Sequence, residues 1–154
     1  MRRTAAILEA FDRTDPAVVL IELYPFGRKK FAFELEPLLE AVHAQGDRRA
    51  KVVCSLRDIL VNQRRDQARH DERAAQNVNR WFDLVLVHSD PAFASLDESF
   101  APATPLTVPV FHTGFVTARP TPVPVGEHRQ ARVIVSSGGG MVGEPIVRAA
   151  VAAH

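Results

Sequence analysis

Four short apolar runs without a polar face constrain the fold of this chain more strongly than any other feature of its sequence. They lie within Ala17–Leu23, Lys51–Ser55, Leu84–His88 and Val108–His112. A strand that is apolar on both sides is typical of a parallel sheet whose two faces are covered. We therefore expect these runs to form one mainly parallel sheet, with strands buried on both faces.

Segments with helical character separate the apolar runs. Apolar residues recur at spacings of three and four in 4–11 and 29–44, and a long polar segment, 62–82, follows the second run. Pro37 lies inside the segment 29–44, where we expect it to start a turn or kink the helix. The alternation of strands and helices predicts an α/β fold with a Rossmann-like sheet.

A change in composition divides the chain. Three prolines lie within 119–130, a pattern typical of a linker. We expect a Rossmann-like domain over 1–118 and the start of a second domain over 131–154. In the second domain a strand at Val133–Ser137 should lead into a glycine loop and then a helix from about Glu144.

Composition excludes several classes of protein. The net charge of +1 gives no strong general attraction to nucleic acid or to a membrane surface. The single cysteine, Cys54, excludes a disulfide within the chain, and no cluster of His, Asp or Glu has the spacing of metal ligands. No apolar run approaches the roughly 20 residues that a membrane span needs, and no signal peptide is evident. The sequence predicts a soluble cytoplasmic protein without a metal or cofactor.

Polar or glycine residues follow every apolar run. Ligands of open α/β sheets bind beyond the carboxyl ends of the strands, so these residues are candidates for one cleft. The candidates are Arg28, Arg57, Asp58, His88, His112, Thr113 and Gly114.

Each candidate also has a purely structural interpretation. Arg28 follows a proline–glycine turn and is also compatible with a solvated side chain. Arg57 and Asp58 are compatible with a network that only orders their loop. His112 is compatible with a packed, hydrogen-bonded histidine. The consecutive residues His, Ser and Asp at 88–90 do not predict a catalytic triad, because sequence neighbours rarely form one.

The strongest local motif is the glycine loop near the end of the chain, formed by Ser137, Gly138, Gly139 and Gly140. Glycines let the backbone approach a phosphate, and the N-terminus of a helix favours anions. The motif lacks the Lys-Ser/Thr of a P-loop. A tight strand-to-helix turn without a ligand is the structural alternative.

Five segments together resemble a known family. The segments "ELYPFGRKKFAFELEPLLE", "VVCSLRDIL", "FDLVLVHSDP", "HTGFV" and "VIVSSGGGMVG" occur in this order in predicted bacterial glycosyltransferases. These are similar to glycosyltransferase family 28, which includes the cell-wall enzyme that transfers N-acetylglucosamine. The resemblance covers nearly the whole chain, and the first four segments are more specific than the glycine loop.

The resemblance implies the GT-B architecture, in which two Rossmann-like domains face each other across a cleft. The N-terminal domain would hold an acceptor, still unknown, and the C-terminal domain a nucleotide diphosphate sugar. Ser137, Gly138, Gly139 and Gly140 match the loop near the donor diphosphate. "HTGF" matches the end of the acceptor domain, which implies that Thr113 and Gly114 face the donor.

The chain departs from the family pattern at both ends. Family members begin with a strand and a glycine-rich loop that precede the first segment seen here, and they continue into a complete donor domain. We therefore expect a fragment that is inactive alone. Ile134, Ile146 and Val147 should either pack on the first domain or leave an apolar patch that favours self-association. The alternative is a non-catalytic nucleotide-binding or regulatory module with a Rossmann-like sheet.

Overall fold

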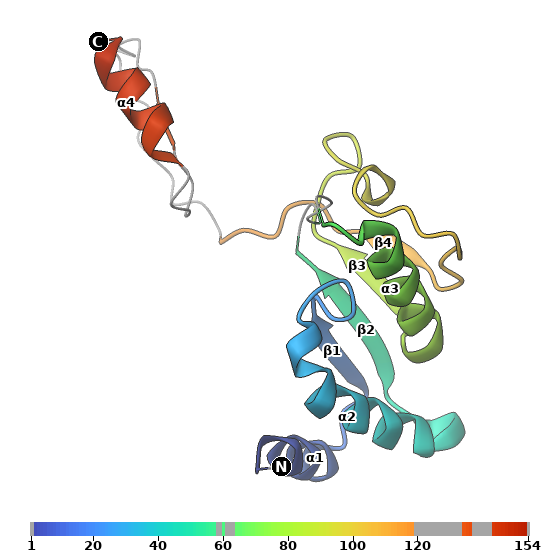
Figure 1. The fold of residues 1–154 in the computed structure, drawn as a ribbon. Helices are drawn as coiled ribbons and strands as arrows, with labels where there is room; N and C mark the ends of the chain where they lie inside the picture. Colours follow the sequence, from blue (N-terminus) through green and yellow to red (C-terminus); the bar gives the residue numbers. More distant parts are fainter. Residues whose placement is uncertain (1, 58–59, 61–63, 119–133, 137–142, 154) are drawn as a thin grey trace, which may run out of the picture. The chain divides into compact units, whose positions relative to one another are not determined.

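The computed structural model describes residues 2–57, 60, 64–118, 134–136 and 143–153. The chain divides into two compact units, residues 1–118 and 119–154, and each is described by itself. The first unit holds the sheet, and the described part of the second holds helix α4, Glu144–Ala152 (Figure 1).

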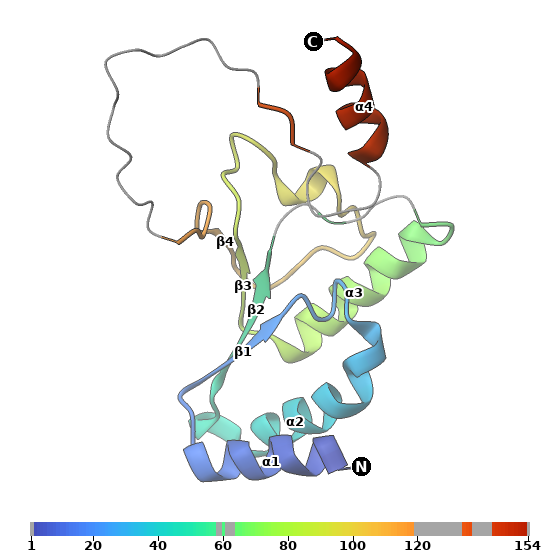
Figure 2. The ribbon, with the colours of Figure 1, turned by 90° about the vertical axis from the view of Figure 1, so that its left-hand side faces the viewer.

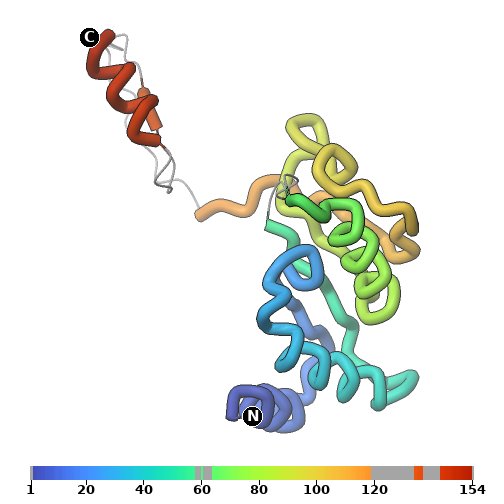
Figure 3. The backbone as a smooth tube through the Cα atoms, in the orientation of Figure 1, coloured from blue at the N-terminus to red at the C-terminus, as the bar shows by residue number. Residues whose placement is uncertain are grey.

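The first unit is an α/β fold, as the alternating pattern predicts. Its strands form a parallel sheet in the order β1-β2-β3-β4, and Figure 3 traces the alternation of strands and helices along the backbone. The strands are β1 (Val18–Glu22), β2 (Lys51–Leu56), β3 (Leu84–Val87) and β4 (Val110–His112). The α-helices of this unit are α1 (Arg2–Thr14), α2 (Ala32–Ala44) and α3 (Gln67–Trp81). Short 3₁₀ turns lie at η1 (Lys29–Phe31), η2 (Gly46–Arg48) and η3 (Leu96–Glu98).

Two local expectations turn out differently. Helix α2 runs through Pro37, which lies in its second turn, so of the two effects expected of the proline it does not start a turn there. The expected strand at Val133–Ser137 is not present in 134–136, the part of it that the structure describes. These three residues are exposed.

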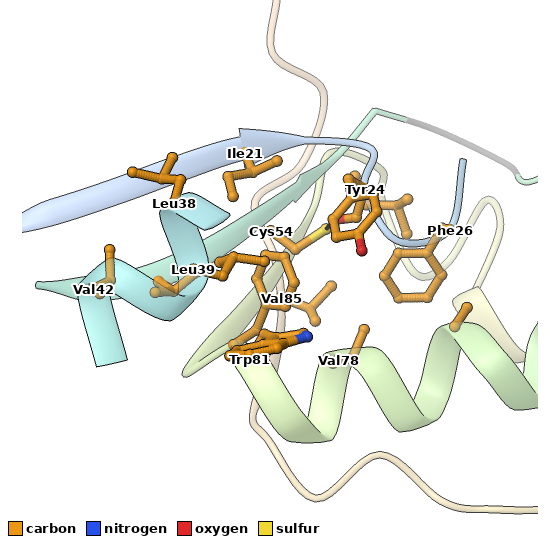
Figure 4. Packing of buried hydrophobic residues seen from close by; sticks show 14 of the residues in the cluster. Ile21, Tyr24, Phe26, Leu38, Leu39, Val42, Cys54, Val78, Trp81 and Val85 are labelled. Carbon is orange, nitrogen blue, oxygen red and sulfur yellow. Dashed lines mark hydrogen bonds between the residues drawn. The ribbon is translucent and has the colours of Figure 1, made fainter. Parts of the chain in front are cut away.

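Helices α2 and α3 cover the same face of the sheet (Figures 1 and 2). Val52, Cys54, Leu56 and Val85 point to this covered face and are fully buried. Figure 4 shows this core, with Trp81 of α3 packed beside Val85. Burying an aliphatic side chain of this size contributes about 1.5–3 kcal/mol, so this face supplies most of the hydrophobic stabilisation of the unit.

The opposite face, called the open face below, is only partly covered in the described residues. Val18 and Leu20 of β1 are 52% and 59% exposed, and Phe111 of β4 is 60% exposed. The expectation of strands buried on both faces is therefore wrong for β1 and β4, although Val53 of β2 is buried. The strand order explains the difference. The two crossovers that contain α-helices step in the same direction, and right-handed crossovers that do so place both helices on one face.

The amino-terminal end of the sheet is held by one carboxylate. Asp83 accepts hydrogen bonds from Arg49 Nη1 and Nη2 at 2.6 and 2.7 Å, and from the backbone N–H of Val52 at 2.8 Å. The hydrogen bonds from Arg49 are the main reason that the pKa of Asp83 falls from 3.8 to about 2. This pair joins the residues that precede β2 and β3.

The only cysteine of the sequence, Cys54, lies in the middle of β2 and is fully buried. Its thiol donates to the carbonyl oxygen of Tyr24, with an Sγ–O distance of 3.3 Å. Burial raises the pKa of Cys54 to about 12, because the surroundings disfavour a thiolate.

The second unit contains helix α4 (Glu144–Ala152). Its apolar residues Ile146 and Val147 are 57% and 43% exposed, and Ile134 is 89% exposed. No helix in the described ranges is long and apolar enough to cross a membrane.

Candidate functional site

A row of polar side chains stands at the carboxyl end of the sheet, on the open face. Glu22 is paired in register with Ser55. Backbone hydrogen bonds of 2.8 and 2.9 Å carry the ladder one residue past β3 and β4, to His88 and Thr113. Residues two apart along a strand share a face, so the four side chains stand in line across the sheet.

Three of these side chains form a chain of hydrogen bonds. Ser55 Oγ lies 2.8 Å from His88 Nε2, and His88 Nδ1 lies 2.8 Å from Thr113 Oγ1. The Thr113 hydroxyl also lies 2.9 Å from the carbonyl oxygen of Gly114. Residues from three strand ends, far apart in the sequence, are thus joined at one place.

Glu22 carries the charge of the row and shares it between two arginines. Arg28 Nη2 lies 3.6 Å from Glu22 Oε2, and Arg57 Nη1 lies 4.0 Å from Glu22 Oε1. Arg28 and Arg57 side chains are 43% and 68% exposed. Two guanidinium groups against one carboxylate leave a net positive charge that faces solvent.

The loop after β1 explains the position of Arg28. Leu23, with a left-handed backbone, donates its N–H to Ser55 O and accepts from the N–H of Gly27. A Cβ at Gly27 would meet the Leu23 side chain at 3.0 Å, so a glycine suits this tight turn. Phe26 anchors the turn by packing its ring against Phe100, with centroids 4.9 Å apart. Arg28 leaves the turn beside Glu22.

His112 does not belong to this row. Its Nδ1 lies 3.4 Å from the hydroxyl of Ser89, which in turn donates to the carbonyl oxygen of Ala94 at 3.2 Å. The side chain lies on the side of the sheet opposite to His88, because neighbouring positions of a strand alternate. It lines a separate pocket of about 420 Å³, whose walls include Leu96, Phe100, Pro105 and Val110.

The chain leaves β4 through Gly114. Gly114 has a φ of +73°, a left-handed backbone that disfavours other residues, and a Cβ there would meet nothing within 4 Å. Phe115 follows and packs edge-on against Phe93, with centroids 5.8 Å apart. Both rings are exposed, at 60% and 71%, so an aromatic surface borders the polar row.

Some expected site residues lie outside the described residues. These are Asp58 and the glycine loop of Ser137, Gly138, Gly139 and Gly140. The structure therefore brings together Arg28, Arg57, His88, Thr113 and Gly114 from the predicted set, and it separates His112 from them.

Sequence reasoning did not select two members of the row, Glu22 and Ser55. Both lie at the carboxyl ends of apolar strands, and their pairing in register is a property of the folded sheet. Strand alternation could have shown which face each side chain is on. Glu22 is two residues after Leu20, and Ser55 is two after Val53, so each lies on the same face as that apolar residue. Their partners, Arg57 and His88, belong to other strand ends and cannot be paired from sequence alone.

The row offers chemistry suited to a polar, anionic ligand. It presents an imidazole, two hydroxyl groups and an excess of guanidinium charge, at the edge where parallel sheets bind ligands. Among the described residues, no group of three or more His, Cys, Asp or Glu side chains is placed to hold a metal ion. Neither the models of protein families, nor the curated proteins, nor the solved structures with which the chain was compared give a match.

Proposed function

We propose that residues 1–118 form the acceptor-side domain of a glycosyltransferase, which transfers a sugar from a nucleotide diphosphate sugar to an acceptor. The observation that carries this proposal is the convergence of all four strand ends on one polar row. Glu22, Ser55, His88 and Thr113 stand on the same face at the same end of the sheet. This matches the place where an open α/β sheet binds its ligand.

The two arginines give the row its preference for an anion. Arg28 and Arg57 share one carboxylate at distances of 3.6 and 4.0 Å, so neither is held in a short ion pair. An exposed pair of this kind contributes little to stability, and a ligand can replace it at low cost. In the proposed reaction these side chains attract the negatively charged substrate to the cleft.

The donor side of the proposal rests on the sequence. Ser137, Gly138, Gly139 and Gly140 form a glycine-rich segment before α4, the arrangement that favours contact between backbone N–H groups and a diphosphate. Neutralising the leaving diphosphate in this way needs no metal. With this function we also propose a location in the cytoplasm, where nucleotide sugars serve as donors.

Binding experiments on the full chain test the proposal. The chain is titrated calorimetrically with UDP-glucose, UDP-N-acetylglucosamine and GDP-mannose. We expect weak binding that depends on the sugar, and loss of that binding in Gly139→Val, because a β-branched side chain blocks approach to the backbone. Binding that Gly139→Val leaves unchanged would contradict the role of the loop.

The same titrations separate the transferase from a regulatory module. A transferase must recognise the sugar that it transfers, so affinities should differ among sugars that share one nucleotide. A module that recognises only the nucleotide should bind UDP and both UDP sugars equally. Equal affinities would favour the module.

A second titration tests the arginines. Inorganic pyrophosphate serves as the probe, and Arg28→Ala with Arg57→Ala should weaken its binding about tenfold or more at low salt. Arg13→Ala with Arg48→Ala is the matched control, since both are exposed arginines outside the row, at the end of α1 and on the turn that precedes β2. Equal loss in the control would show a general charge effect.

A further inference from the structure

The hydrogen bonds between Ser55, His88 and Thr113 have a direction. Each residue contributes one hydrogen, and the last oxygen in the chain, the carbonyl of Gly114, can only accept. The Thr113 hydroxyl lies 2.9 Å from this carbonyl and 3.4 Å from that of Val87, so its hydrogen points to Gly114. Thr113 Oγ1 is then an acceptor for His88 Nδ1–H.

This direction fixes the tautomer of His88. When Nδ1 carries the hydrogen of the neutral ring, Nε2 has a free lone pair. The lone pair faces Ser55 Oγ at 2.8 Å and accepts the hydrogen of the serine. In the reverse direction Thr113 would have to give up its bond to Gly114. All three hydrogens find acceptors within the protein only in the order Ser55 to His88 to Thr113 to Gly114.

The arrangement has the parts of an activated hydroxyl. A hydroxyl lies within hydrogen-bond distance of a base, and a third group orients that base from its other nitrogen. Here the third group is a neutral hydroxyl rather than a carboxylate. Ser55 and His88 are partly exposed and Thr113 is exposed, so solvent and ligands reach the chain from the open face.

We infer that His88 is the general base of this surface and that Ser55 is the hydroxyl through which it takes a proton. As a step of glycosyl transfer this rests on the proposed function. An acceptor hydroxyl hydrogen-bonded to Ser55 Oγ passes its proton to Ser55, and the proton of Ser55 moves to His88 Nε2. The acceptor oxygen forms its bond to the anomeric carbon while the bond from that carbon to the diphosphate breaks. The nucleoside diphosphate leaves with the electron pair, and His88 returns its proton to water.

Thr113 acts as a positioning residue in this relay. Its contribution to the relay is to keep the hydrogen of His88 on Nδ1. Serine at position 113 retains the hydroxyl that does this, and valine does not. The pair of substitutions therefore separates the tautomer from packing at this position.

A serine-reactive probe tests the relay without any sugar transfer. The full chain is treated with an alkyl fluorophosphonate, which forms a bond from phosphorus to an activated serine oxygen and releases fluoride. Peptide mass spectrometry identifies the serine. We expect Ser55 to react fastest of the serines, with labelling reduced about 100-fold in His88→Gln and about tenfold in Thr113→Val. Thr113→Ser should keep labelling within about twofold of the wild type.

Nitrogen-15 NMR of the histidine rings supplies the second readout. The signals of His88 are identified by their loss in His88→Gln, and they should show a protonated Nδ1 in the wild type and in Thr113→Ser but not in Thr113→Val. Thr107→Val is the control for loss of an exposed hydroxyl elsewhere. Circular dichroism of each variant shows whether it is folded.

The outcomes distinguish this inference from the proposed function. Labelling of Ser55 that requires His88, in a chain that binds no nucleotide sugar, would support the relay and contradict glycosyl transfer. Binding of nucleotide sugars without such labelling would overturn the relay alone. Labelling that is equal in the wild type and His88→Gln would also overturn it.

Discussion

The two ends of the sheet each pair a carboxylate with arginine, and they differ in how tightly. At the amino-terminal end the Asp83 carboxylate accepts hydrogen bonds from Nη1 and Nη2 of Arg49 at 2.6 and 2.7 Å. The Asp83 side chain is 19% exposed and that of Arg49 is 23% exposed. At the carboxyl-terminal end Glu22 meets Arg28 at 3.6 Å and Arg57 at 4.0 Å, all largely in solvent. Short hydrogen bonds from the protein occupy both oxygens of Asp83, whereas Glu22 makes only long, exposed ion pairs.

The difference assigns a structural role to the amino-terminal pair and a ligand-binding role to the carboxyl-terminal pair. A bidentate, partly buried pair with a backbone hydrogen bond is specific in geometry and joins two segments of the chain. A loose, exposed pair contributes little to folding, but its charges remain accessible to a ligand. The comparison predicts that substitutions at the first end change stability and that substitutions at the second end change binding.

The largest effect is expected for Asp83→Ala. It leaves the Arg49 guanidinium and the Val52 N–H without their acceptor, which should lower the free energy of unfolding by about 3 kcal/mol. Urea unfolding followed by the fluorescence of Trp81, the only tryptophan, measures it. Asp47→Ala, an exposed aspartate on η2, is the control and should change stability by less than about 0.5 kcal/mol. Equal losses in both variants would break the comparison.

Acid should remove much of the same stabilisation without a mutation. The pKa of Asp83 is about 2 in the folded chain against 3.8 when unperturbed, mainly because of the hydrogen bonds from Arg49. A depressed pKa stabilises the fold above pH 3.8, and the stabilisation is lost as the pH falls from 3.8 to about 2. The amount is about 2 kcal/mol. The gap in unfolding free energy between the wild type and Asp83→Asn should narrow over this range, and a constant gap would contradict the assignment.

The smallest effect on stability is expected for Glu22→Gln. Both ion pairs of Glu22 are exposed, so the free energy of unfolding should change by less than about 0.5 kcal/mol. Removing the carboxylate frees Arg28 and Arg57, and pyrophosphate should then bind about threefold more tightly at low salt. Calorimetry measures the affinity. A large loss of stability, or weaker binding, would show that Glu22 has the structural role that we assign to Asp83.

Much of the fold follows from sequence because its signals are local. The apolar runs at Val18–Glu22 and Leu84–Val87 need no knowledge of their neighbours to be recognised as strands. The partial exposure of Leu20 and Phe111 was not predictable in this way, because it depends on the strand order and thus on where both helices lie. The outcome at 134–136, where a strand was expected, was equally unpredictable, because strand formation depends on pairing with a distant segment.

The site was predictable as a location but not as a set of contacts. The rule that ligands bind beyond the carboxyl ends of parallel strands selected Arg28, His88 and Thr113. It also selected His112, which points to the other face, since one residue along a strand reverses the side chain. The contact of Ser55 with His88 spans 33 residues and depends on the register of β2 and β3.

The lone thiol in the middle of the sheet makes opening of the core measurable by the rate of its chemical modification. Cys54 is sealed in the core and holds its proton strongly, so a disulfide reagent in solution reacts with it only when β2 separates from α2 and α3. The rate of that reaction therefore counts opening events of the core. A ligand that bridges the strand ends would slow the modification of Cys54, and a ligand that binds elsewhere on the surface would leave the modification rate unchanged.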